Sequence, residues 1–202
     1  SRLDIEQATT MPFIGDVPKS VSNEAIISSS SRTRAAEALR IVRTNLEFLL
    51  NEVPEGIAKT IFLTSTFPKE GKTFISVNLA STIALSDKKV LLLGLDIRNP
   101  KLEEYLDVPK VGVTNYLASK DHKNSADFLT KVEGFSNFYV MPTGVIPPNP
   151  AELLMGKKVG ELFEKLKQEF DYIIVDTAPV SLVTDTLLIS KYADAFVYVT
   201  RA

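Results

Sequence analysis

Short apolar runs alternate with amphipathic segments along most of the chain, from about residue 60 onward. The runs are continuous rather than alternating, as in VLLLGL at 90–95 and YIIV at 172–175. Continuous runs of this length are typical of parallel strands that are buried on both faces of a sheet. The pattern therefore predicts an α/β fold of the P-loop NTPase type, with a mostly parallel central sheet and helices on both faces.

The segment before this alternating part is different in character. Residues 1–31 are polar and interrupted by prolines, so we interpret them as an arm or linker that touches the domain through PFIGDVP at 12–18. Residues 32–202 are predicted to form one domain, which opens with an amphipathic helix at 33–51 whose apolar stripe is Leu39, Val42, Leu46 and Leu49. We predict strands at 61–65, 90–95, 138–141, 172–176 and 195–200, helices at 72–86, 150–170 and 183–192, and an irregular helical region at 101–131.

The loop between the first predicted strand and the next helix carries the clearest chemical signal. It reads STFPKEGKT, and Gly71, Lys72 and Thr73 open the helix. In a phosphate-binding loop, backbone N–H groups surround the phosphates, the lysine reaches the β- and γ-oxygens, and the hydroxyl binds Mg²⁺. Thr66 stands where the general pattern has its first glycine, and a plain strand–turn–helix corner is the alternative. The candidate nucleotide-binding residues are Lys69, Glu70, Gly71, Lys72, Thr73 and Phe74.

Two aspartates follow later strands. Asp96 ends the run VLLLGLD and Asp176 ends YIIVD. Ligands bind at the carboxyl ends of parallel strands, so both carboxylates are expected at the edge where the loop lies. Asp176 has the position of a Mg²⁺-binding aspartate opposite Thr73. Either residue could instead be a helix cap or turn former.

Composition narrows the classes of function. The formal net charge is −2, which argues against a general nucleic-acid or anionic-membrane surface. There is no cysteine and only one histidine, His122, in a polar stretch that we interpret as a solvated loop. Thiolate catalysis, cysteine or histidine metal clusters and Ser-His triads are therefore excluded. No run reaches the roughly 18 apolar residues of a membrane span, so we expect this piece of chain to be soluble.

Other motifs separate the classes of phosphate-binding protein. The guanine-reading NKxD string and the protein-kinase HRD and DFG set are absent from the sequence. ATPases of the MinD and ParA type carry a signature lysine five residues before the loop lysine. That position is Phe67 here, and Lys69 is out of register, so this class is disfavoured.

The chain resembles the cytoplasmic kinase domain of bacterial tyrosine kinases (BY-kinases) over nearly its whole length. Five motifs carry the resemblance together, and none of them is specific alone. They are the loop STFPKEGKT, the strand leading to Asp96-Ile97-Arg98, IIVDTAPV followed by VTD at 183–185, TGVIPPNPAELL at 143–154, and the E-x-x-R-x-x-R pattern of Glu37, Arg40 and Arg43.

This resemblance implies ATP and Mg²⁺ as cofactors and a tyrosine autokinase activity that regulates capsule or exopolysaccharide synthesis and export. It gives Lys72, Asp96 and Asp176 catalytic roles and makes Thr73, Asp96 and Asp176 the metal ligands. It also implies that Glu37, Arg40 and Arg43 join subunits of a ring, although residues at this spacing can equally form one solvated flank of a helix.

The family context implies further partners. A membrane-spanning polysaccharide co-polymerase or activator segment, in the same chain or a partner, precedes the domain, and residues 4–18 resemble the stretch that follows it. The expected location is the cytoplasmic side of the bacterial inner membrane. The substrate would be a tyrosine-rich tail of a neighbouring subunit, which, with further fold, would lie beyond Ala202. The six tyrosines present are scattered and are interpreted as core residues. No nucleic-acid partner is expected.

One departure from the family leaves alternatives open. The family's second motif commonly has two aspartates two residues apart, and Gly94 replaces the first of them. Asp96 could then act alone, or the enzyme could be slow or inactive. A MinD/ParA-like ATPase switch and a non-catalytic nucleotide-binding assembly module are the alternative functions.

Overall fold

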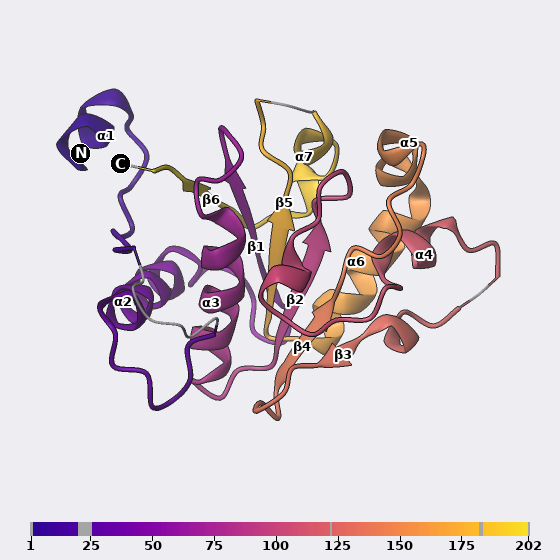
Figure 1. Ribbon diagram of the computed structural model, residues 1–202, viewed down its shortest axis with the longest axis horizontal. Coiled ribbons are helices and arrows are strands. Elements are labelled where there is room, and N and C mark those ends of the chain that lie inside the picture. Colours follow the sequence, from indigo (N-terminus) through magenta and orange to yellow (C-terminus); the bar gives the residue numbers. More distant parts are fainter. Residues whose placement is uncertain (1, 20–25, 122, 182–183, 202) are drawn as a thin grey trace.

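A single sheet forms the centre of the chain. The structure, a computed structural model, describes residues 2–19, 26–121, 123–181 and 184–201. Within them the strand order is β3-β4-β2-β5-β1-β6, and all neighbours pair in parallel except β3 with β4 (Figure 1). The predicted mostly parallel sheet is therefore confirmed. The strands are β1 (Lys59–Ser65), β2 (Val90–Leu95), β3 (Thr130–Lys131), β4 (Phe138–Met141), β5 (Tyr172–Thr177) and β6 (Ala195–Val199).

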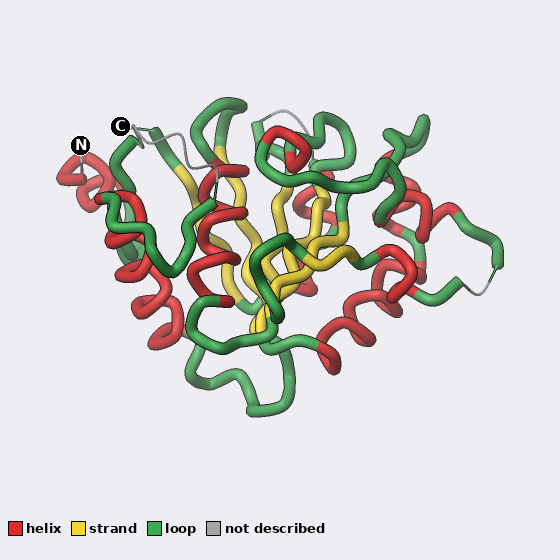
Figure 2. The backbone as a smooth tube through the Cα atoms, turned by 60° about the horizontal axis from the view of Figure 1, so that its bottom comes forward, coloured by secondary structure: helices red, strands yellow, loops and turns green. Residues whose placement is uncertain are grey.

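Helices cover both faces of the sheet, as predicted. Figure 1 shows α2 and α3 on one side and α4, α5 and α6 on the other, and Figure 2 shows the strands between these layers. The helices are α1 (Arg2–Ala8), α2 (Arg34–Leu49), α3 (Lys72–Ala84), α4 (Val113–Ala118), α5 (Pro150–Met155), α6 (Lys157–Glu169) and α7 (Asp185–Leu188), with 3-10 turns η1 (Leu102–Glu104), η2 (Ser125–Phe128) and η3 (Ser190–Tyr192).

The continuous apolar runs follow from this layering. In β2, Leu92 packs into the core on the α2–α3 side, whereas Leu91 and Leu93 pack into the core on the α6 side. Successive side chains of a strand point to opposite faces, so a strand covered on both faces needs apolar residues at every position. The same rule places Gly94 and Asp96 on the α3 side of the sheet.

Helix α2 lies over α3, which itself packs on the sheet. The Thr33 hydroxyl accepts a hydrogen bond from the Ala36 amide at 3.1 Å and caps α2. The stripe predicted for this helix is buried except for Leu49, which is 51% exposed. A 3.6-residue period carries Leu49 away from Leu39 around the helix, and Leu50 packs in the core instead.

The structure differs from the sequence prediction at several elements. The arm contains helix α1, and the irregular region at 101–131 ends in strand β3. The helices predicted at 150–170 are confirmed as α5 and α6, and Gly156, with extended backbone, separates them. Tyr198 of β6 is 42% exposed rather than part of the core, because β6 is at the edge of the sheet and is only partly covered. His122 and Val183 lie outside the described residues.

No helix in the described part of the chain is both long and apolar enough to cross a membrane.

Candidate nucleotide-binding site

The 66–71 loop connects β1 to α3 and is held in shape by its own side chains. The Glu70 carboxylate accepts a hydrogen bond from the Phe67 amide at 2.9 Å, and the Ser65 hydroxyl donates to the Phe67 carbonyl at 2.9 Å. Lys69 and Gly71 have positive φ angles of 67° and 91°. These bonds and backbone angles turn the loop into the first turn of α3. The N–H groups at the start of a helix have no partner within the helix, so they favour the binding of anions.

Neighbouring segments fix the beginning of this loop. The amide of Val180 donates to the Ser65 carbonyl at 2.9 Å, and the amide of Ser181 donates to the Thr66 carbonyl at 3.2 Å. The Thr66 and Tyr198 hydroxyls also share a hydrogen bond. The segment after β5 and the edge strand β6 therefore both support the residue that replaces the usual first glycine.

Asp176 forms the buried centre of the site. It lies near the end of β5, opposite Leu63 of β1, and only 2% of its surface is exposed. Its carboxylate accepts hydrogen bonds from the Lys72 ammonium at 2.6 Å, the Thr73 hydroxyl at 3.1 Å and the Ser76 hydroxyl at 3.0 Å. Because a buried charge is costly unless it is paired and hydrogen-bonded, this arrangement stabilises both Asp176 and Lys72.

Asp96 follows β2 directly and adds a second carboxylate. It is 8% exposed, and it accepts a hydrogen bond from the Asn99 amide at 3.1 Å. Burial raises the pKa of Asp96 above the ordinary value of 3.8; the positive charge of Lys72 opposes this shift, and the negative charge of Asp176 adds to it. A cation bound beside Asp96 would favour its ionised form.

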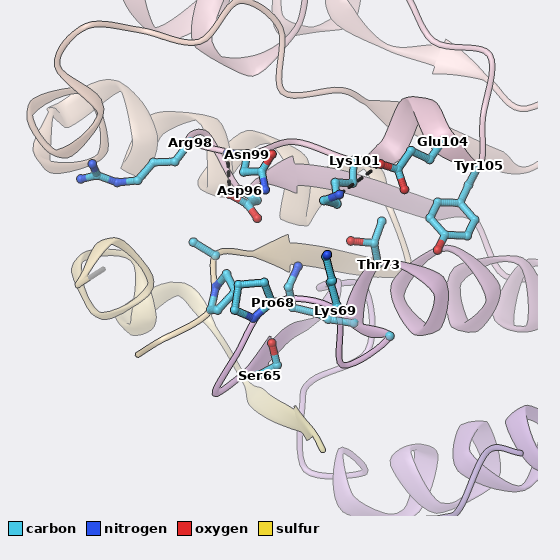
Figure 3. A pocket seen from close by; sticks show the side chains of 14 residues that line it. Ser65, Pro68, Lys69, Thr73, Asp96, Arg98, Asn99, Lys101, Glu104 and Tyr105 are labelled. Atoms are coloured by element: carbon cyan, nitrogen blue, oxygen red, sulfur yellow. Dashed lines mark hydrogen bonds and ion pairs between the residues drawn. The ribbon is translucent and has the colours of Figure 1, made fainter. Parts of the chain in front are cut away.

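These groups meet at a cavity of about 300 Å³ at the carboxyl end of the sheet. One wall is the 66–71 loop with the start of α3, and the facing wall is the segment that follows β2 (Figure 3). The cavity is lined by Ser65, Pro68, Lys69, Gly71, Lys72, Thr73, Asp96, Arg98, Asn99, Lys101, Glu104, Tyr105, Ala178 and Pro179.

Most of the predicted site residues come together here. Asp176 hydrogen-bonds to Lys72 and Thr73 of the cavity wall, although it does not itself line the cavity. Glu70 and Phe74 are also outside the lining. The Glu70 side chain is bonded within the loop, and the ring of Phe74 packs against Tyr105 with ring centroids 6.3 Å apart.

Sequence reasoning assigned no role to several residues of the site. Arg98 donates two hydrogen bonds to Asp185, at 2.6 and 3.0 Å, and thereby connects the segment after β2 to α7. Lys101 pairs with Glu104 at 3.1 Å on the same wall. Their position just after a strand that ends in Asp96 was the available signal. Ser76 follows Lys72 by one helical turn, and that spacing could have identified it.

The charged residues Glu37, Arg40 and Arg43 of α2 do not line this cavity. Arg40 pairs with Glu37 at 2.5 Å and donates to the Ser31 carbonyl at 3.0 Å. Arg43 donates to the Thr82 carbonyl of α3 at 3.3 Å, while its Nε is buried without a partner. Arg43 therefore fastens α2 to α3 within one chain, and Glu37 and Arg40 remain on the more exposed side.

The residues present fit a nucleotide with Mg²⁺. Mg²⁺ prefers oxygen ligands and is usually held by one or two carboxylates together with substrate phosphates. The Thr73 hydroxyl and the Asp176 and Asp96 carboxylates offer such oxygens beside the Lys72 ammonium. In the described part of the chain no group of three or more His, Cys, Asp or Glu side chains could hold a metal ion by itself.

Comparison with known proteins gives the site a family context. A family model described as an AAA domain matches residues 58–199. Tyrosine-protein kinase wzc of Salmonella typhimurium is 35% identical over 168 residues, which cover 83% of this chain and 22% of that protein. The chain thus spans about a fifth of the length of this relative.

Solved structures give the same picture. The kinase domain of Escherichia coli tyrosine kinase ETK superposes with a TM-score of 0.76 and 35% identity, over 84% of this chain and 64% of that one. The septum site-determining protein MinD of Pyrococcus horikoshii, complexed with Mg-ADP, has a TM-score of 0.58 at 22% identity, over 71% of this chain and 58% of that one. The second likeness shows the fold alone. The first, with the match to the wzc kinase, shows that this chain belongs to the family of bacterial tyrosine-protein kinases.

Proposed function

We propose that this chain is an ATP- and Mg²⁺-dependent protein-tyrosine kinase domain of a capsule or exopolysaccharide system. The observation that carries the proposal is the grouping of Lys72, Thr73 and Asp176 at one cavity, with Asp96 on the facing wall. The 35% identity to named tyrosine-protein kinases supports the choice of acceptor.

Each group has a role that its position supports. Bound ATP supplies the phosphoryl group, and backbone N–H groups at the start of α3 hold its phosphates. Lys72 neutralises charge on the β- and γ-phosphates, while Thr73, Asp176 and Asp96 would hold Mg²⁺. Phosphoryl transfer depends mainly on positioning and charge neutralisation, so we infer that the single carboxylate of Asp96, directly after β2, can serve in it.

The proposal is tested by following the γ-phosphate of labelled ATP, with Mg²⁺ and a tyrosine-rich acceptor peptide. We expect label on peptide tyrosine. Free labelled phosphate without labelled peptide would instead support the ATPase switch, for which the MinD-like fold is the supporting observation. Bound but intact ATP would support an assembly module, for which Gly94 is the supporting residue.

The same proposal extends to location and partners. We place the domain, residues 32–202, on the cytoplasmic side of the bacterial inner membrane, and the arm, residues 1–31, after a membrane segment. The acceptor tyrosines belong to the tail of a neighbouring subunit, and a polysaccharide co-polymerase or activator segment is the membrane partner.

Subunit contacts give a separate prediction. We expect the double substitution Arg40→Ala and Arg43→Ala to shift a ring-like homo-oligomer toward monomers, measured by light scattering after size-exclusion chromatography. Arg43 also fastens α2 to α3, so the single variant Arg40→Ala is the cleaner probe of the surface. An unchanged mass for both variants would leave Glu37 and Arg40 as solvated residues and Arg43 as a contact between α2 and α3 within one chain.

A further inference from the structure

Lys69 has a backbone conformation that its residue type does not favour. Its φ of 67° lies in the left-handed region, where Cβ approaches the following carbonyl oxygen. Gly71 also has a positive φ angle, 91°, but glycine has no Cβ and adopts this conformation without strain. Residues with side chains that are held in this region cluster at functional sites. A glycine at position 69 would satisfy the loop, so the lysine side chain calls for an explanation.

Asp87 provides the contrast. Among the described non-glycine residues, only Lys69 and Asp87 have positive φ, and Asp87 lies in the turn after α3 with a φ of 60°. Asp and Asn are several-fold enriched in the left-handed region, because their short polar side chains can bond locally. The turn at Asp87 is therefore ordinary, whereas the conformation of Lys69 is not.

The charges of the cavity show what Lys69 can do. Four cationic side chains line the cavity, and three of them already pair with carboxylates: Lys72 with Asp176, Arg98 with Asp185 and Lys101 with Glu104. Within the part of the chain that the structure describes, the fourth, Lys69, has no hydrogen bond or ion pair. It is thus a positive charge already available to an anionic ligand.

The direction of the side chain agrees with this role. Figure 3 shows Lys69 pointing from the loop into the cavity, toward the wall that carries Asp96 and Lys101. The Lys72 ammonium, by contrast, pairs with Asp176 at 2.6 Å, and only 7% of the Lys72 side chain is exposed. Lys69 thus faces the cavity, whereas the Lys72 ammonium is held by Asp176.

We propose that Lys69 is a second phosphate-binding lysine, whose ammonium group binds the γ-phosphate of a nucleoside triphosphate. This inference rests on the proposed function, because it requires the cavity to be the nucleotide site. In the transfer, the bond between the γ-phosphorus and the bridging oxygen of ADP breaks and a bond to the tyrosine oxygen forms. The tyrosine proton leaves to solvent. The role of Lys69 is to neutralise charge on the moving group.

The proposal predicts a selective loss of affinity. With Mg²⁺ present, Lys69→Gly should bind a non-hydrolysable ATP analogue about 10-fold or more weakly, since a charge-assisted hydrogen bond has at least this effect. Its affinity for ADP should change less than about 2-fold, which isothermal titration calorimetry can resolve. Lys69→Asn, which suits left-handed backbone but carries no charge, should behave in the same way, and Lys69→Arg should retain most of the selectivity.

Asp87→Gly is the matched control. Asp87 is the other described non-glycine residue with a positive φ angle, and it does not line the cavity. Both affinities should stay unchanged in that variant. An equal loss for the ATP analogue and ADP in Lys69→Gly would overturn the γ-phosphate assignment, and so would no loss at all. If the wild-type chain bound neither nucleotide, the proposed function would fall together with this inference. If it bound both, only the role of Lys69 would be at stake.

Discussion

Lys72→Met is expected to abolish phosphoryl transfer, with a rate at least about 100-fold below that of the wild-type chain, since single preorganised charged or hydrogen-bonding groups contribute this much to catalysis. Methionine has a similar length but carries no charge, so the β- and γ-phosphates lose their principal cation. The substitution also leaves Asp176 buried without its ion-pair partner, supported only by the Thr73 and Ser76 hydroxyls. Initial rates of tyrosine labelling, together with thermal melting to confirm folding, provide the measurement.

Lys88→Met is the control for this substitution. Lys88 is an exposed lysine in the turn that leads into β2, at the end of the sheet opposite the cavity. The Lys88→Met variant should transfer phosphate at the wild-type rate. Wild-type transfer by Lys72→Met would show that the phosphates do not bind at this cavity.

The ion pair between Lys72 and Asp176 stabilises two buried charges at the proposed site. Both charges are nearly inaccessible to water, and each satisfies the other across 2.6 Å. If Mg-ATP binds as proposed, its phosphates would take the place of Asp176 beside Lys72, and Mg²⁺ would take the place of Lys72 beside Asp176. Such an exchange would leave neither buried charge unpaired.

The fold could be predicted where burial alone determines the pattern. The runs at 90–95 and 138–141 are covered on both faces, and the structure places β2 and β4 at these bounds. Helix α1 was missed because it is short and presents no apolar stripe, and Leu3 on it is 67% exposed. Strand β3 has only two residues, whose pairing with β4 is set by tertiary contacts rather than by local sequence.

The candidate site divides in a similar way. Gly71, Lys72, Thr73, Asp96 and Asp176 could be predicted, because strand ends and a loop motif place them at one edge of the sheet. The bond between Arg98 and Asp185 could not, since the two residues are 87 positions apart and only the packing of α7 brings them together. Nor could the sequence show that Lys69 has no charged partner among the described residues, because this depends on how the other cations of the cavity are paired.

The absence of a carboxylate at position 94 is built into the packing around it. A Cβ atom at Gly94 would lie 2.8 Å from the Thr143 hydroxyl and 3.0 Å from both the Thr143 amide nitrogen and a Leu102 methyl group. The Thr143 hydroxyl in turn donates to the Gly94 carbonyl at 3.1 Å. Thr143 and Leu102 therefore fill the space that an aspartate side chain would need, and Asp96 is left as the carboxylate that β2 presents to the cavity.

We expect Gly94→Asp to lower the free energy of unfolding by at least about 3 kcal/mol, and not to increase phosphoryl transfer. The new Cβ would lie 2.8 Å from the Thr143 hydroxyl and 3.0 Å from the Thr143 amide nitrogen, so the segment after β4 would have to shift, and the carboxylate would be buried beside Asp96 and Asp176. Urea denaturation at constant m-value measures the loss. Gly94→Ala separates packing from charge and should lose about half as much. A Gly94→Asp variant that is as stable as the wild type and transfers phosphate faster would show that the site lacks a carboxylate it could use.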